Sequence, residues 1–253
     1  MCNMFKLTVF EFRKLLQSKS LYICSGLLAV LSAFSIYTTK LMQDGVDVAD
    51  PTLCGLNNLM EALPTSMIST FLGIFIALFV CEDYTSGTIR NVLTRGFSRF
   101  SVYLSKYFAV LAATVLMSVI CCAACFIAGT IIWGAGDAAF GSEQVKILLC
   151  QLVVIVAYAS LFFALSSVLQ KTGGAIALCI VLPMVLTVVL KLADTALAER
   201  EIELSHYWLS KLIKGIGSIT VEKDALKDAL LYSAIYIPVS LAAGWLATMK
   251  REY

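Results

Sequence analysis

Residues 107–132 read YFAVLAATVLMSVICCAACFIAGTII and contain no Asp, Glu, Lys or Arg. A helix needs about 20 apolar residues to cross the ~30 Å hydrocarbon core of a bilayer, and this run is longer than that. Its residues do not alternate between apolar and polar types, as the strands of a transmembrane barrel do. The segment therefore predicts a membrane-spanning helix.

Five more runs of the same kind occur along the chain. They cover about 21–39, 62–81, 147–169, 174–192 and 229–249, with no acid, Lys or Arg in their central parts. Of the 253 residues, 60% are hydrophobic and only 14% are charged, whereas a soluble domain has about 25% charged residues. We predict an all-α integral membrane protein with six transmembrane helices, which form a single domain over residues 1–253.

The distribution of Lys and Arg predicts the orientation. Six spans place both termini on one side, where eleven basic residues lie against eight on the other. The contrast is clearer in the two short loops of the second side, which have one basic residue each, Lys40 and Lys146. The positive-inside rule then places both termini and residues 82–106 in the cytoplasm. We expect a multi-pass protein of the cell membrane, with a first span that is not a cleaved signal peptide.

Residues 4–19, before the first span, have an amphipathic pattern. Apolar residues recur along one helical face at Phe5, Val9, Phe12 and Leu16. Basic residues lie elsewhere on the helix, where they can approach anionic headgroups. The pattern predicts an interfacial helix on the cytoplasmic leaflet. The alternative is a plain cytoplasmic extension of the first span.

The longest predicted outer segment is 193–228, and it also contains an amphipathic pattern. Leu204, Trp208 and Leu212 fall on one helical face. We expect a helix that either rests on the outer leaflet or caps the bundle. His206 is the only histidine, so we interpret it as an interfacial polar residue without a partner for a metal site or a catalytic dyad.

Several familiar chemical sites are missing from the sequence. Asp44, Asp47 and Asp50 do not have the spacing of an EF-hand and indicate a solvated loop. The C-x-x-C within 121–125 lies in an apolar run, where small packing residues are expected. The P-loop pattern for ATP is absent. We expect no catalytic residue, no metal site and no cofactor bound by this chain, and no nucleic-acid partner.

Residues 82–106, EDYTSGTIRNVLTRGFSRFSVYLSK, form the only substantial cytoplasmic connection. Thr85 or Ser86 can cap a short helix that begins near Gly87. The apolar residues of that helix share one face: Ile89, Val92, Leu93 and Phe97. We expect the segment to be a docking surface for a partner.

The charged residues of this segment are the candidate contacts. The arginines would reach phosphates, headgroups or acids of the partner, and Glu82 and Asp83 would pair with its basic residues. The simpler reading of Arg90, Arg95 and Arg99 is ordinary positive-inside charge.

The stretch EDYTSGTIRNVLTRGFSRFSVYLSKYF, residues 82–108, resembles the segment after the second span of ABC-2 type transporter permeases. These are the small six-span permeases found beside bacitracin- and lantibiotic-resistance ATPases. EFRKLLQSKSLYI, residues 11–23, resembles the amphipathic entry helix of that family. The matching features are Glu82–Asp83, Tyr84, Gly87–Thr88, Arg90, Arg99 and Ser105–Lys106. The motifs cover about 40 residues, and the six-span layout covers the whole chain.

The resemblance implies the permease subunit of an ATP-driven exporter in the bacterial cell membrane. Two permeases would pair, the second being another copy or a paralogue, and two copies of a separate ABC ATPase would hold ATP and Mg²⁺. Residues 82–99 would be the coupling helix. The implied coupling residues are Glu82, Asp83, Gly87, Thr88, Ile89, Arg90, Leu93, Arg95, Phe97 and Arg99.

The substrate is the least constrained expectation. Spans without charged residues suit an amphipathic or apolar cargo, and permeases of this kind handle antimicrobial peptides and hydrophobic compounds. We expect export of, or protection against, such a peptide, with substrate-binding residues that the sequence does not identify. The alternatives are export of a lipid or an ion, an energy-independent scaffold or assembly factor, and an intramembrane enzyme or secondary carrier.

Overall fold

The computed structural model describes residues 2–44, 54–134, 141–196, 204–217, 221 and 223–249, and the regular secondary structure within these ranges is helical. Six helices are long and apolar enough to cross a membrane. They are α2 (Lys19–Asp44), α4 (Ser66–Thr85), α6 (Arg99–Trp133), α7 (Ser142–Leu169), α8 (Thr172–Ala196) and α10 (Lys223–Met249). The predicted all-α, six-span architecture is confirmed at this level, and the chain is a multi-pass membrane protein.

The second span is shifted along the chain from its predicted limits. We predicted 62–81, but residues 62–65 form a turn between α3 (Gly55–Glu61) and α4. Pro64 lies in this turn, and a proline disfavours helix both at its own position and at the residue before it. At its other end α4 continues to Thr85, so Glu82 and Asp83 belong to a helix and not to a loop.

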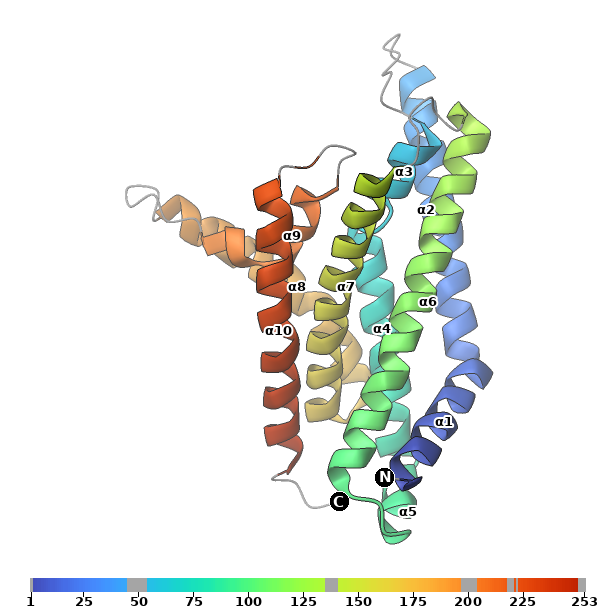
Figure 1. Ribbon diagram of the computed structural model, residues 1–253, viewed down its shortest axis with the longest axis vertical. Helices are drawn as coiled ribbons and strands as arrows, with labels where there is room; N and C mark the ends of the chain where they lie inside the picture. Colours follow the sequence, from blue (N-terminus) through green and yellow to red (C-terminus); the bar gives the residue numbers. More distant parts are fainter. Residues whose placement is uncertain are drawn as a thin grey trace.

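The long helices stand roughly side by side, with α7 between α10 on one side and α4 and α6 on the other (Figure 1). Gly244 of α10 lies so close to α7 that a Cβ there would approach Ala164 Cβ to 2.9 Å. Gly73 of α4 would similarly approach Cys179 Cβ of α8 to 3.1 Å. Small residues at such positions let helices approach closely in a bilayer, where the hydrophobic effect does not drive their association.

The N-terminal helix α1 (Cys2–Gln17), the short helix α5 (Thr88–Thr94) and the C-terminal end of α10 lie at one end of the bundle, which we call the α5 end (Figure 1). Helix α1 meets α2 at an angle (Figure 1). Ser18 separates the two helices and donates its hydroxyl to the Leu15 carbonyl at 2.8 Å. One face of α1 packs on the bundle through Leu7 and Leu15. The predicted apolar stripe, Phe5, Val9, Phe12 and Leu16, is exposed.

Helix α8 leans out of the bundle toward its C-terminus (Figure 1). Its two buried residues, Ala175 and Cys179, both precede Pro183. Beyond that proline the exposed side chains are large and apolar: Met184, Val185, Val188, Val189 and Leu192. An apolar face of this extent suits a hydrocarbon environment better than water.

The opposite end of the bundle is covered by two short pieces, η2 (Leu204–Tyr207) and α9 (Leu209–Gly215). We predicted one helix here, but Trp208 is extended, with φ −85° and ψ 134°, and divides it. Trp208 is also buried, and its indole N–H donates to Thr187 Oγ1 of α8 at 3.0 Å. Leu209, Leu212 and Ile213 are buried with it, so the segment caps the bundle.

A contact between η2 and α10 also lies at this end of the bundle. His206 Nε2 lies 3.2 Å from Asp228 Oδ2 of α10, a contact that the sequence analysis did not predict. The two residues are 22 positions apart, and the pattern of the sequence does not reveal their proximity. Asp47 and Asp50, predicted to lie in a solvated loop, fall outside the described residues.

Candidate functional site

The candidate site is the corner at the α5 end where α4, α5 and α6 follow one another. The chain leaves α4 at Thr85 and turns at Gly87, which has φ +69°. It leaves α5 through Gly96, which has φ +85° and whose N–H donates to the Leu93 carbonyl at 3.0 Å. Glycine adopts this left-handed conformation without the steric penalty of a Cβ. Two glycine turns therefore delimit the seven-residue helix α5.

The predicted helix exists, but its predicted cap was wrong. Gly87 occupies the cap position, and no side chain bonds the first amides of α5. Thr85 Oγ1 instead donates back to the Cys81 and Glu82 carbonyls of α4, and the Ser86 hydroxyl bonds Thr88 Oγ1 at 2.8 Å. The following helix is properly capped, because Ser98 Oγ accepts from the Ser101 N–H at 3.2 Å.

The predicted coupling residues divide into two groups. Ile89 is buried, and Val92, Leu93 and Phe97 are half-buried, although Phe97 lies beyond the end of α5. Glu82, Arg95 and Arg99 are exposed. The side chain of Arg90 is not among those the structure describes. The helix thus directs an apolar face inward and leaves charged side chains at the surface beside it.

Asp83 departs from its predicted role as an exposed partner residue. Its carboxylate accepts from Lys14 Nζ of α1 through one oxygen and from Lys106 Nζ of α6 through the other. The Asp83 and Lys106 side chains are each 4% exposed and that of Lys14 is 24% exposed. Charge-assisted bonds of this kind are among the stronger ones in proteins. Asp83 therefore ties α1, α4 and α6 together from within.

Glu11 of α1 joins this group, which we call the ion cluster: Glu11, Lys14, Asp83 and Lys106. Glu11 is 4% exposed, and its Oε2 has no hydrogen-bond partner. Burial raises the pKa of its carboxyl, with a further rise from Asp83, while Lys106 and Lys14 oppose the shift. One acid of the cluster is thus firmly paired, and the other binds a proton more readily than a free glutamate.

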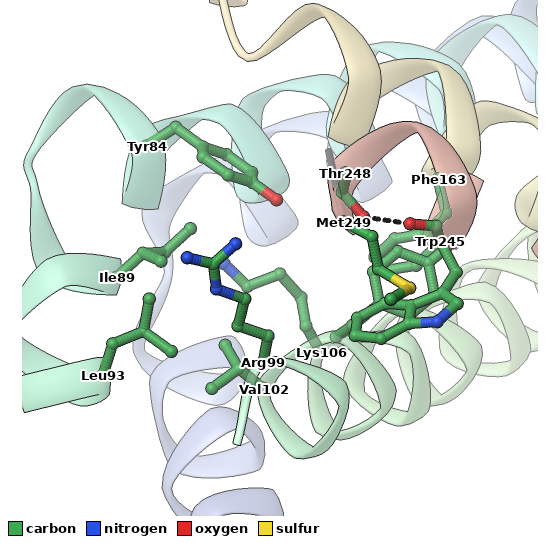
Figure 2. Close-up of a pocket in the computed structure, with 11 residues that line it drawn as sticks. Tyr84, Ile89, Leu93, Arg99, Val102, Lys106, Phe163, Trp245, Thr248 and Met249 are labelled. Carbon is green, nitrogen blue, oxygen red and sulfur yellow. Dashed lines mark hydrogen bonds between the residues drawn. The ribbon is translucent and has the colours of Figure 1, made fainter. Parts of the chain in front are cut away.

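A small cavity lies under α5, between that helix, α6 and the end of α10 (Figure 2). Ile89 and Leu93 form its α5 wall, and Trp245 and Met249 form its α10 wall. Its accessible space is about 30 Å³, which is room for one or two water molecules and not for a ligand. Helix α5 therefore rests on the bundle with a gap beneath it.

The residues of the ion cluster were only partly indicated by the sequence. Lys106 was among the matching features of the family resemblance, and Glu11 and Lys14 lie in the stretch 11–23 that resembles the entry helix of that family. Glu11 and Lys14 stand three positions apart, so they lie close together along α1.

Gln151 of α7 was missed entirely. It is fully buried, and its amide donates to the Met60 and Ile216 carbonyls at 2.9 and 2.7 Å. A lone amide inside an apolar run was its only signal.

Residues 27–253 match a protein family that is described as "Protein of unknown function (DUF2705)". The match includes α5 and two members of the ion cluster, Asp83 and Lys106. Among curated proteins no match was found.

Proposed function

We propose that this chain, which belongs to the DUF2705 family, is the membrane subunit of an ATP-driven transporter and that α5 is its coupling helix. The observation that supports this most is the form of α5. It is a short helix between two positive-φ glycines, at one end of a bundle of six candidate spans. A separate ATPase needs such an element, because it must push on the membrane helices from outside.

The surroundings of α5 suit the transmission of a movement. Helix α4 leads directly into α5, and α6 directly follows it. The ion cluster joins the last turn of α4 to α1 and α6. The gap under α5 leaves room for a small displacement. In this proposal, the ATPase moves α5, and the ion cluster passes the displacement to three helices at once.

The proposed orientation has the α5 end in the cytoplasm. Over the whole sequence this side carries eleven Lys and Arg residues against eight on the other, and the positive-inside rule then favours it as the cytoplasmic side. The exposed apolar stripe of α1 would then lie in the cytoplasmic leaflet as an interfacial helix. Both termini would be cytoplasmic, in the cell membrane of a bacterium.

The resemblance to ABC-2 permeases supplies the rest of the proposal. The working unit would contain two permeases, either two copies or this chain with a paralogue, and two ATPase subunits that bind ATP and Mg²⁺. The chain itself would not be an enzyme. Its cargo would be an antimicrobial or otherwise amphipathic peptide, or a hydrophobic compound.

Co-purification is the direct test. The chain would be expressed together with the ATPase encoded beside it and purified through a tag on this chain alone. We expect the ATPase in about a one-to-one ratio, with ATP hydrolysis by the complex. Arg95→Glu at the end of α5 should weaken the complex, whereas Lys214→Glu, an exposed charge reversal at the opposite end, should not. A chain that purifies without any ATPase in mild detergent would contradict the proposal and favour a scaffold.

A further inference from the structure

A second cavity opens at the α5 end, on the side of α4 where α1 bends into α2. Its volume is about 720 Å³, within the range of sites that hold small ligands. Its walls come from four helices: α1, the start of α2, the end of α4 and the start of α8. It is a different space from the gap under α5, and the proposed coupling function does not use it. We call it the elbow cavity.

The charge of the elbow cavity is positive. Arg13, Lys14 and Lys19 line it, and Glu82 is the one carboxylate among its lining residues. Lys14 is already paired with Asp83, which lies outside the cavity. Arg13 and Lys19 are both exposed and contribute two cations against Glu82. Guanidinium and ammonium groups are the side chains that bind phosphate best.

Its uncharged lining adds hydrogen-bonding groups on one side and apolar surface on the other. Ser20 lies in the first turn of α2, and Thr172 is the first residue of α8. The first amides of a helix lack partners within it and favour a nearby anion, which reinforces the effect of the basic side chains. Phe10, which is 51% exposed, and Leu78 provide the apolar wall. The cavity therefore presents a cationic, hydroxyl-bearing surface beside an apolar one.

We propose that the elbow cavity binds the headgroup of one anionic phospholipid from the surrounding leaflet. The phosphodiester would pair with Arg13 and Lys19, and the acyl chains would leave past Phe10 and Leu78. A soluble phosphate would satisfy the cations but would leave the apolar wall unused. The place where α1 meets the first span also suits a lipid, because Phe10 of α1 lines the cavity and is 51% exposed. The inference rests on the proposed function only for the choice of the cytoplasmic leaflet.

Lipid binding at this place would reach the candidate coupling site. Glu82 and Thr85 of the last turn of α4 line the cavity directly. Lys14 contributes to the cavity and, through its ammonium group, to the ion cluster. A bound headgroup would therefore contact both α1 and the end of α4 that leads into α5.

The test uses the purified chain alone, without an ATPase, so its result is independent of the transporter proposal. The protein is exposed to equimolar phosphatidylglycerol and phosphatidylcholine in detergent, and the bound lipid is counted by native mass spectrometry. We compare Arg13→Gln/Lys19→Gln with a control, Lys6→Gln/Arg95→Gln. The control makes the same charge change at exposed residues of the same end that do not line the cavity.

We expect the wild type to retain phosphatidylglycerol in preference to phosphatidylcholine. Loss of two cations near the headgroup should weaken phosphatidylglycerol binding by roughly 30-fold in the cavity variant and by much less in the control. An equal loss in both variants would mean general surface attraction and would overturn the site. Displacement of the lipid by millimolar inorganic phosphate would overturn the lipid assignment in favour of a soluble anion.

Discussion

Replacement of Asp83 by Asn isolates the contribution of the ion cluster. Asn removes the carboxylate that is paired with both Lys14 and Lys106 and leaves the size of the side chain nearly unchanged. Lys14, 24% exposed, can turn toward the elbow cavity and water, but Lys106, 4% exposed, has no such route. Removal of one partner from a buried pair costs about 3–5 kcal/mol, because the other charge stays buried without its hydrogen-bonded counter-ion. We expect Asp83→Asn to lower the free energy of unfolding by about that amount.

The matched variants follow from the same exposures. Lys14→Gln leaves the buried Asp83–Lys106 pair intact and should cost only about 1 kcal/mol, as for a partly exposed pair. Lys106→Gln should fall between the two, since Asp83 keeps Lys14. Glu11 provides a further check. In the Asp83→Asn variant, Glu11 is the remaining counter-charge in the cluster. Glu11→Gln should therefore destabilise that variant more than it affects the wild type.

Unfolding of each variant in mixed detergent micelles, titrated with a denaturing detergent, would give these free energies. The diagnostic result is the order Asp83→Asn, Lys106→Gln, Lys14→Gln, from the most to the least destabilised. If Lys14→Gln were as costly as Asp83→Asn, the pair with Lys106 would contribute little. The cluster would then not be the tie between α4 and α6 that we describe.

Three other predictions concern the same end of the molecule. Gly87→Ala places a Cβ at φ +69°, where no neighbouring atom obstructs it but the backbone is strained. We expect this variant to lose about 1–2 kcal/mol of stability in thermal unfolding and to lose coupled ATP hydrolysis. Gly173→Ala, which also has open space around it, should have neither effect. Glu11 has a raised pKa in the folded protein, so its contribution to stability is greatest below the pKa of the unfolded chain and is lost as the pH rises through the folded value. Glu11→Gln should therefore be more stable than the wild type at neutral pH, and unfolding at a series of pH values should show this advantage shrink as the medium becomes acidic. Gly244→Ala would bring a Cβ to 2.6 Å from Tyr103 Oη and 2.9 Å from Ala164 Cβ, so α10 must shift. We expect about 1–3 kcal/mol of destabilisation for unfolding in detergent. Gly26→Ala, where nothing lies within 4 Å of the added Cβ, serves as the neutral comparison.

The large features of the fold were predictable because they depend on composition over windows of about 20 residues. Each of the six apolar runs became a helix long enough to span a bilayer. The break before α4 was missed because hydropathy continues through residues 62–65, while the backbone limits of Pro64 end the helix. The short α5 was predicted from its apolar spacing, but its glycine cap was not, since a side-chain cap is the commoner signal.

The candidate site was only partly predictable for a different reason. Helical periodicity shows which residues share a face of one helix, and it says nothing about which helix that face meets. Asp83 is 69 positions from Lys14 and 23 from Lys106, so their contact is a product of the packing of three helices. The same applies to Trp208, which is buried and donates to Thr187 of a different helix, a contact that helical periodicity does not reveal.

The outward lean of α8 has a consequence for how the protein is made. A helix that leaves the translocon is sheltered either by helices already inserted or by lipid alone. Because the part of α8 beyond Pro183 has few neighbours in the bundle, its partition into the bilayer must depend on its own apolar side chains, such as Val185 and Val188. A charge introduced there would act during biosynthesis, before any tertiary structure exists. The observable result would be a chain in which this segment is not inserted and lies on the wrong side of the membrane, while the remaining helices pack normally.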